Sequence, residues 1–259
     1  MKNLFDIKGK VAIVTGGSRG IGAMIAKGYV ENGVRTYISA RKQQELAETE
    51  QQLSALGECV GIAADLSSLG GIEAFVTAIK EREASIDILV NNAGAAWGED
   101  VLSFPESGWD KVMDINLKAP FFLTQQLQPL LKKAGSHATP SRIINISSIH
   151  GLICPSLPTY SYSASKAGMI QLTRHLAVAM ATDNIRVNGI APGFFPSKMT
   201  AFALAEEGEA IGAKNLLGRI GEPEDIAGAA IYLASRASAW MTGHTLVLDG
   251  GEVASAGAI

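Results

Sequence analysis

Short apolar runs alternate with longer stretches of helical periodicity along the whole chain. The runs occupy residues 11–14, 34–38, 59–63, 86–90, 142–146, 185–190 and 245–248. Short runs of this kind are typical of buried strands, and the segments between them are long enough to form helices. Strands that alternate with helices favour a parallel sheet, because the crossover helices then cover both of its faces. The pattern predicts an α/β fold with a parallel sheet of about seven strands.

Helical periodicity is clear in the segments that follow the first and the fifth apolar run. In the first, Ile21, Ile25 and Tyr29 repeat at the spacing of one helix face. In the second, an apolar stripe runs from Met169 to Met180. We expect both segments to be helices that pack one face on the sheet.

No linker, low-complexity stretch or internal repeat interrupts this alternation, so we expect residues 1–259 to form a single domain. The one long departure is the segment 192–221, which is rich in Gly and Pro at both ends. It follows the sixth predicted strand, at the edge where an open α/β sheet binds its ligands. We therefore interpret 192–221 as a substrate flap, and the alternative is a surface excursion of two short helices.

Composition and charge exclude several classes of protein. Of the 259 residues, 47% are hydrophobic and 18% are charged, which supplies a large core and is not typical of a disordered or fibrous chain. The formal net charge is −3 and the basic residues are scattered, so the attraction on which nucleic-acid binding depends is missing. We expect no nucleic-acid partner.

The sequence carries no signal for a membrane, for secretion or for a metal. No apolar run approaches the roughly 20 residues of a membrane-spanning helix, and residues 1–10 lack the apolar stretch of a signal peptide. The two cysteines, Cys59 and Cys154, have no partners spaced for a zinc site. We expect a cytoplasmic protein with reduced thiols, no bound metal and no contact with a membrane.

A glycine-rich turn joins the first predicted strand to the first predicted helix. Residues 15–22 read TGGSRGIG, which places backbone N–H groups at a helix N-terminus, where they can bind a pyrophosphate. Glycine lets the backbone turn tightly and approach a ligand closely. The spacing differs from the G-x-G-x-x-G of the common dinucleotide-binding pattern, so a purely structural turn is the alternative.

Two further motifs follow this turn along the chain. Residues 91–94 read NNAG and residues 162–166 read YSASK. Together with residues 15–22 they resemble the motifs of the short-chain dehydrogenase/reductase family, and the resemblance spans the whole chain. It implies a Rossmann-type, doubly wound fold. It also implies an oxidoreductase that moves a hydride between a nicotinamide dinucleotide and a small-molecule carbonyl or alcohol.

The residues after the second predicted strand indicate which dinucleotide is used. NAD enzymes of this fold are expected to place an acidic residue there, against the ribose 2′-hydroxyl, but this chain has Ser39, Ala40 and Arg41. With Arg41 and Arg19 available to pair with a 2′-phosphate, NADP(H) is favoured over NAD(H). The alternative is that both arginines are solvated surface residues.

The family's cofactor-binding pattern maps onto the glycine turn, the ends of several strands and the YSASK motif. The positions that match are Gly16, Ser18, Arg19, Gly20, Ile21, Gly22, Arg41, Asp65, Leu66, Asn92, Ala93, Gly94, Tyr162, Lys166, Pro192, Gly193 and Ser197. Asp65 is also a candidate helix N-cap.

Tyr162 is the candidate proton donor. Reduction of a ketone places a proton on oxygen, and an unperturbed tyrosine, with a pKa of about 10, holds its proton too tightly for the reverse reaction. Lys166 lies four positions on, which in a helix is the same face, so we expect its ammonium to favour the phenolate and lower the pKa of Tyr162. Tyr160 has Ala164 at the corresponding position and lacks such a partner.

Two more side chains complete the catalytic set that the resemblance implies. Ser147 and Ser148 end the fifth predicted strand, where a hydroxyl can hydrogen-bond the substrate oxygen. The family pattern selects Ser148, although its separation from Tyr162 is one residue longer than is common, which leaves Ser147 as the alternative. Asn116 matches the family's asparagine that holds a water leading to the lysine; without the family it is a polar residue in a helix.

At Arg19, Gly98, Gly108, Trp109 and residues 191–200 (APGFFPSKMT) the chain resembles, within the family, 3-oxoacyl reductases of the acyl-carrier-protein type, in particular those associated with rhamnolipid synthesis. This implies reduction of a 3-oxoacyl thioester, carried on acyl carrier protein or coenzyme A. Six apolar residues are candidates for an acyl pocket, although they would also suit a steroid, a quinone or core packing: Trp97, Ile149, Leu152, Ile153, Phe194 and Phe195. The alternatives are an NADP(H)-dependent dehydrogenase of a polyol, sugar or other secondary alcohol, and a non-catalytic dinucleotide-binding sensor. Because relatives are commonly homotetramers, we expect one here.

Overall fold

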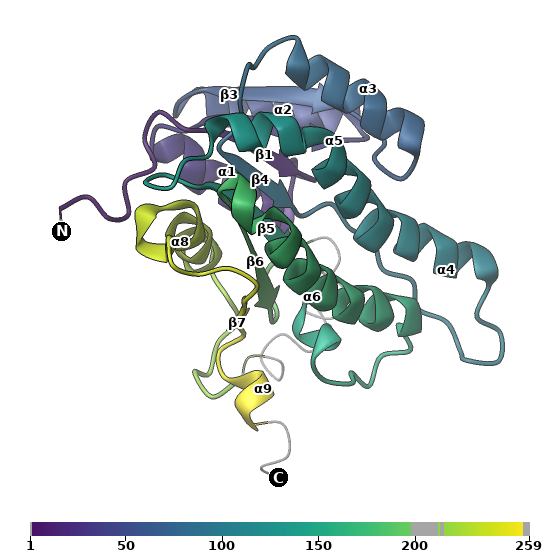
Figure 1. Ribbon diagram of the computed structural model, residues 1–259. Helices are drawn as coiled ribbons and strands as arrows, with labels where there is room; N and C mark the ends of the chain where they lie inside the picture. Colours follow the sequence, from purple (N-terminus) through teal and green to yellow (C-terminus); the bar gives the residue numbers. More distant parts are fainter. Residues whose placement is uncertain (1, 198–211, 213–214, 256–259) are drawn as a thin grey trace.

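The computed structural model describes residues 2–197, 212 and 215–255. Within them, seven parallel strands form one sheet in the order β3-β2-β1-β4-β5-β6-β7 (Figure 1). The strands are β1 (Val11–Thr15), β2 (Arg35–Ala40), β3 (Cys59–Ala63), β4 (Ile88–Asn91), β5 (Ser141–Ile146), β6 (Ile185–Pro192) and β7 (Thr245–Leu248). The predicted α/β fold with a parallel seven-stranded sheet is confirmed.

Helices and short helical turns connect the strands. The helices are α1 (Gly20–Glu31), α2 (Gln43–Ser54), α3 (Leu69–Lys80), α4 (Glu106–Met113), α5 (Ala119–Ala134), α6 (Tyr160–Met180), α8 (Pro223–Ala234) and α9 (Glu252–Ser255). The short turns are the π-helical η1 (Asp114–Lys118) and the 3₁₀ turns η2 (Ile149–Gly151), η3 (Ala181–Asp183) and η4 (Arg236–Ser238).

The sheet is buried on both faces, because successive side chains of each strand point to opposite sides. Ile13, Leu89 and Ile143 are paired across β1, β4 and β5 and pack against the layer formed by α3, α5 and α6. Their neighbours Val14 and Ile144 pack against α1, α2 and α8. Figure 1 shows α8 on one side of the strands and α5 and α6 on the other. The fold is thus doubly wound, with a hydrophobic core on each face.

Helix α1 forms where the periodicity predicts it, with Ile25 and Tyr29 fully buried. Gly28 lies at the contact between α1 and α8, because a Cβ built there would be 2.8 Å from the Cβ of Ala227. The Tyr29 hydroxyl donates to the carbonyl oxygen of Ala230 at 3.2 Å. The glycine therefore lets two helices that are distant in sequence pack closely.

A crevice lies between β1 and β4, where the order of the strands in the sheet changes direction. The sheet grows from β1 through β2 to β3 on one side and continues with β4 on the other, which is where doubly wound sheets bind ligands. The Thr15 hydroxyl donates to Val90 O at 3.2 Å and accepts from the N–H groups of Asn92 at 2.9 Å and Ala93 at 3.0 Å. One side chain thus holds the glycine turn beside the NNAG loop.

The predicted flap 192–221 is described only at its ends, because residues 198–211, 213 and 214 lie outside the described residues. The Gly193 N–H donates to Leu248 O at 2.9 Å, and the Gly221 N–H donates to Phe194 O at 2.8 Å. These bonds join the two ends of the segment to each other and to β7.

Two kinds of feature are missing among the residues that the structure describes. No helix among them is both long enough and apolar enough to cross a membrane. Over the same residues, no three His, Cys, Asp or Glu side chains gather in a way that would hold a metal ion.

Candidate active site

A cavity of about 450 Å³ lies over the carboxyl ends of the central strands. Its walls come from the glycine turn, the segment after β2, the loop after β4 and the first turns of α6. Every residue that the sequence assigned to the cofactor lines this cavity. Five of the lining side chains are Lys or Arg and three are Asp or Glu, an excess of positive charge that suits an anionic ligand.

The glycine turn leaves room for a ligand against the backbone. Gly16 and Gly20 have φ values of 65° and 53°, in the left-handed region that favours glycine. A Cβ on Gly22 would collide with the Gly16 carbonyl oxygen and with Nδ2 of Asn92. Arg19 precedes α1 without capping it through its side chain, which leaves the first N–H groups of the helix available to an anion.

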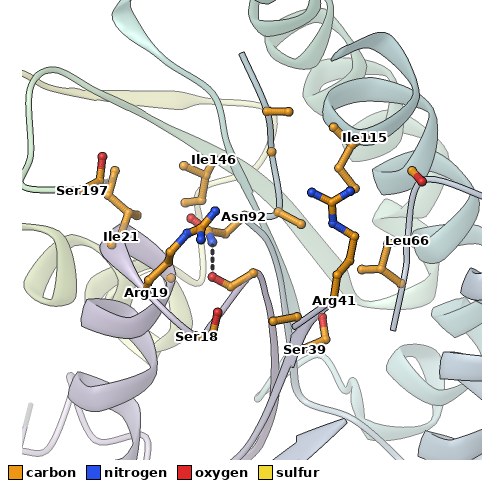
Figure 2. A pocket seen from close by; sticks show the side chains of 18 of the residues that line it. Ser18, Arg19, Ile21, Ser39, Arg41, Leu66, Asn92, Ile115, Ile146 and Ser197 are labelled. Atoms are coloured by element: carbon orange, nitrogen blue, oxygen red, sulfur yellow. Dashed lines mark hydrogen bonds between the residues drawn. The ribbon is translucent and has the colours of Figure 1, made fainter. Parts of the chain in front are cut away.

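Two arginines extend into the cavity from different elements (Figure 2). Arg19 belongs to the glycine turn, and its Nη1 lies 3.1 Å from Oε2 of Glu45 on α2. Arg41 follows β2 and is exposed. The pair provides guanidinium groups of the kind that bind phosphate oxygens well.

The Ser39 hydroxyl is a buried polar group with no hydrogen-bond partner among the described residues, and Ser39 lines the cavity. A buried hydroxyl without a partner is costly, so a bound ligand with a polar group would stabilise it. Asp65 is not the N-cap of α3; that residue is Ser68, whose side chain accepts from the Gly71 N–H. Asp65 accepts instead from the Ser67 hydroxyl at 2.7 Å, which lowers the pKa of Asp65.

Tyr162, Lys166 and Ser148 meet in one part of the cavity wall. Helix α6 places the tyrosine and the lysine one turn apart, and Lys166 Nζ lies 5.6 Å from the centroid of the Tyr162 ring. The buried ammonium donates to Ile146 O at 2.8 Å. Ser148 Oγ accepts from the His150 N–H at 3.2 Å, and the Ser148 side chain is close enough to Tyr162 to lower the pKa of the phenol.

Ser147, which the sequence left as an alternative, and Tyr160, which it rejected, both have other contacts. Ser147 Oγ donates to the backbone oxygen of Lys166 at 2.7 Å, so its hydroxyl is used to attach β5 to α6. Tyr160 is exposed, and its ring lies edge-on to Phe104 with 5.9 Å between the centroids. Of the two serines, Ser148 is therefore the one that acts on the Tyr162 phenol.

The pKa of Tyr162 is shifted in the direction opposite to our expectation. Burial raises it, and the hydrogen bond with Ser148 only partly opposes the rise. Burial also lowers the pKa of Lys166 to about 8. The expectation was wrong because loss of water disfavours the phenolate, and the group that opposes this rise is Ser148 rather than Lys166. The result is a phenol that stays protonated at neutral pH, as a proton donor must.

Asn116 lies behind the cavity wall and does not line it. The residue is buried in the π-helical turn η1, where the sequence suggested an ordinary helix. Its side chain accepts from the Ala95 N–H at 2.8 Å and donates to Ala95 O at 3.0 Å and to Ser165 Oγ at 2.9 Å. A Cβ on Gly94 would lie 3.1 Å from Asn116 Oδ1 and 3.8 Å from Lys166 Nζ, so the two side chains flank the same glycine.

Sequence reasoning missed several residues of the cavity wall. Lys42 and Glu45 lie one and four positions after Arg41, and their place at the start of a helix was a usable signal. Lys111 comes from α4, and no motif pointed to it. Of the acyl-pocket candidates, Phe195 lines the cavity, whereas Trp97 packs beneath Lys111 with 5.0 Å between Nζ and the ring centroid.

Comparison with known proteins shows to which family a chain with this cavity belongs. The family model described as Enoyl-(Acyl carrier protein) reductase matches residues 16–252. The chain belongs to the short-chain dehydrogenase/reductase family. The predicted family is thereby confirmed, and the cavity corresponds to the part of this family's fold where the sequence motifs gather.

Individual members of the short-chain dehydrogenase/reductase family are similar over nearly the whole chain. The rhamnolipids biosynthesis 3-oxoacyl-[acyl-carrier-protein] reductase of Pseudomonas aeruginosa is 46% identical, over 97% of this chain and 99% of its own length. The 2-dehydro-3-deoxy-D-gluconate 5-dehydrogenase of Dickeya dadantii is 37% identical, over 97% and 98%. The solved Pseudomonas aeruginosa RhlG/NADP active-site complex superimposes with a TM-score of 0.93 at 46% identity, covering 98% of this chain and all of the other.

Proposed function

We propose that this chain is an NADPH-dependent reductase that converts a 3-oxoacyl thioester into the 3-hydroxyacyl product. The observation that carries the proposal is the protonated Tyr162 phenol, which lines a cavity that suits a dinucleotide together with Ser148 and with Lys166 one helical turn away. Similarity to the rhamnolipids biosynthesis reductase supports the substrate class, and similarity to the RhlG/NADP complex supports the cofactor.

The residues of the cavity fit NADP(H). The N–H groups at the start of α1 would hold the pyrophosphate, and Arg19 and Arg41 would pair with the 2′-phosphate. The unpartnered Ser39 hydroxyl would gain a polar neighbour from the bound dinucleotide. When bound, the cofactor supplies the hydride, and the chain's own residues supply everything else.

The remaining roles concern the proton. Ser148 holds the substrate oxygen and Tyr162 donates its proton to that oxygen as charge develops there. Lys166 places a positive charge beside the phenol at the moment it becomes a phenolate. Asn116, through its two bonds to Ala95, fixes the loop that faces the lysine.

Oxidation of NADPH, followed by its absorbance, tests the proposal. The candidate substrates are 3-oxoacyl thioesters on coenzyme A and on acyl carrier protein, sugar acids, polyols and simple ketones. We expect the thioesters to be reduced with the highest kcat/KM. Faster turnover of a sugar acid or a polyol would favour the alternative dehydrogenase.

Two tyrosine variants in the same helix separate catalysis from structure. Tyr162→Phe removes only the proton donor, and we expect kcat to fall by about a thousandfold. Tyr160→Phe removes an exposed hydroxyl outside the cavity and should leave kcat within about twofold. Full activity in Tyr162→Phe would contradict the assignment and favour a non-catalytic dinucleotide-binding protein.

Assembly and location are part of the same proposal. We infer that a single-domain chain forms a homotetramer in the cytoplasm and receives its acyl group on acyl carrier protein or coenzyme A. The tetramer is supported by an open apolar groove between η1, α5 and α6, lined by Leu117, Phe121 and Leu172. Light scattering from the purified protein tests it: a monomer at micromolar concentration would contradict the assembly but not the activity.

A further inference from the structure

Glu45 places a negative charge among the cations of the cavity. Its Oε2 lies 3.1 Å from Nη1 of Arg19, and its Oε1 lies 3.2 Å from Nζ of Lys42. All three residues line the cavity, and the Glu45 side chain is only 25% exposed. One carboxylate thus pairs with two cations in the region where we place the 2′-phosphate.

The local structure explains why the carboxylate stays there. Glu45 lies in the first turn of α2, where the helix dipole stabilises an acidic side chain. One turn later, Thr49 Oγ1 lies 2.9 Å from the backbone oxygen of Ser18 in the glycine turn. That contact holds the start of α2 against the turn that carries Arg19, so the ion pair joins two elements that are already in contact.

A carboxylate and a phosphate are alternatives for the same guanidinium. A phosphate monoester carries a charge of about −1.5 to −2 at neutral pH and takes the same donors as a carboxylate. A 2′-phosphate that binds Nη1 of Arg19 must displace the Glu45 carboxylate, and one that binds the other guanidinium nitrogens has the carboxylate nearby as a like charge. Both effects oppose the binding of a 2′-phosphate, and neither opposes the binding of a ribose that carries only a 2′-hydroxyl.

We propose that Glu45 is an internal competitor of the 2′-phosphate, which weakens the binding of NADP(H) and leaves the binding of NAD(H) almost unchanged. The inference rests on the proposed function, because it takes NADP(H) as the cofactor. Its consequence for turnover is faster release of the oxidised cofactor, a step that limits kcat in many enzymes. Partly exposed ion pairs are weak, so the effect is a few-fold adjustment of affinity.

Calorimetric titration of NADPH and NADH, without a carbonyl substrate, tests this competition. In Glu45→Gln we expect the Kd for NADPH to fall by about three- to tenfold and the Kd for NADH to change by less than about twofold. The matched control is Glu48→Gln, because Glu48 lies on the same helix, is exposed, pairs with Gln44 and does not line the cavity. It should bind both cofactors as the wild type does.

Two further variants show whether the tighter binding of NADPH in Glu45→Gln depends on Arg19. Arg19→Gln alone should weaken NADPH binding, and Glu45→Gln added to it should tighten binding by less than it does in the wild type. The inference would be overturned if Glu45→Gln weakened the binding of NADPH or left it unchanged. It would also be overturned if the variant bound NADPH and NADH more tightly by the same factor. A wild-type chain that does not prefer NADPH to NADH would overturn the cofactor assignment itself, so the two failures are distinguishable.

Discussion

The two ends of strand β5 each adjoin a buried cation, and the difference between the two shows what makes a buried charge functional. At the amino end, Arg142 is 2% exposed and donates to Ser235 O at 2.9 Å, just past the end of α8. At the carboxyl end, Lys166 is 5% exposed and donates to Ile146 O at 2.8 Å. Each therefore binds a backbone carbonyl, but Lys166 lines the cavity and Arg142 does not.

Electrostatics alone does not separate these two cations. Burial lowers the pKa of Arg142 to about 10 and the pKa of Lys166 to about 8. Arg142 even has two nitrogen atoms, Nε and Nη1, without a partner among the described residues. Its guanidinium stabilises the carboxyl end of a helix, where a cation is favourable. A perturbed pKa indicates a reactive group only where space for a substrate adjoins it.

The largest expected effect tests this contrast directly. Lys166→Met removes the cation from the cavity, and we expect kcat for carbonyl reduction to fall by about a thousandfold because the Tyr162 phenolate loses its neighbouring charge. Arg142→Met removes the other buried cation, and we expect kcat to stay within about twofold. Steady-state kinetics and circular dichroism of both variants provide the measurement. Equal losses in two folded variants would contradict the division into a reactive and a structural end.

The pH dependence of stability gives a smaller effect with a defined sign. Lys166 has a pKa of about 8 in the folded chain against 10.5 in the unfolded chain, so folding opposes its protonation. The penalty is fully present below pH 8 and corresponds to about 3 kcal/mol. Between pH 8 and 10.5 the unfolded state binds more protons, so the free energy of unfolding rises with pH through this window.

Urea unfolding of the wild type and Lys166→Met across this window checks the sign. We expect the variant to be more stable at pH 7, with the difference shrinking as the pH approaches 10.5. Other titrating groups, such as Tyr29, contribute equally to both proteins and cancel in the difference. A difference that is constant over the window would mean that the lysine is not buried as a charged group.

The sequence predicts best those strands whose boundaries depend on residues close to them along the chain. The runs 59–63 and 245–248 coincide with β3 and β7. The run 86–90 began too early, because the Ile86 N–H donates to Leu130 O of α5 at 3.2 Å and the strand starts only at Ile88. That partner lies far along the chain, so no local pattern could reveal it.

The same distinction holds in the candidate site. The sequence motifs identified the whole glycine turn, Tyr162 and Lys166, because the chemistry of the site requires these residues at fixed short spacings along the chain. Lys111 and the pairing of Glu45 with Arg19 depend on which helices meet across the cavity, and the motifs do not encode that. The direction of the Tyr162 pKa shift depends on depth of burial, which a helical spacing of four residues does not report.

The smallest expected effects concern two glycines, one in α1 and one in α8. Other atoms fill the space beside the first, and the space beside the second is empty. A Cβ on Gly28 would lie 2.8 Å from the Cβ of Ala227, whereas Gly228 is exposed and a Cβ there would meet nothing within 4 Å. Gly28→Ala should destabilise the chain by about 1 kcal/mol or more, because it forces the helices apart. Gly228→Ala should stabilise it by about 0.5–1 kcal/mol, because alanine loses less entropy in a helix. Urea midpoints that shift in the same direction for both variants would show that helix propensity, rather than the adjoining space, decides the outcome.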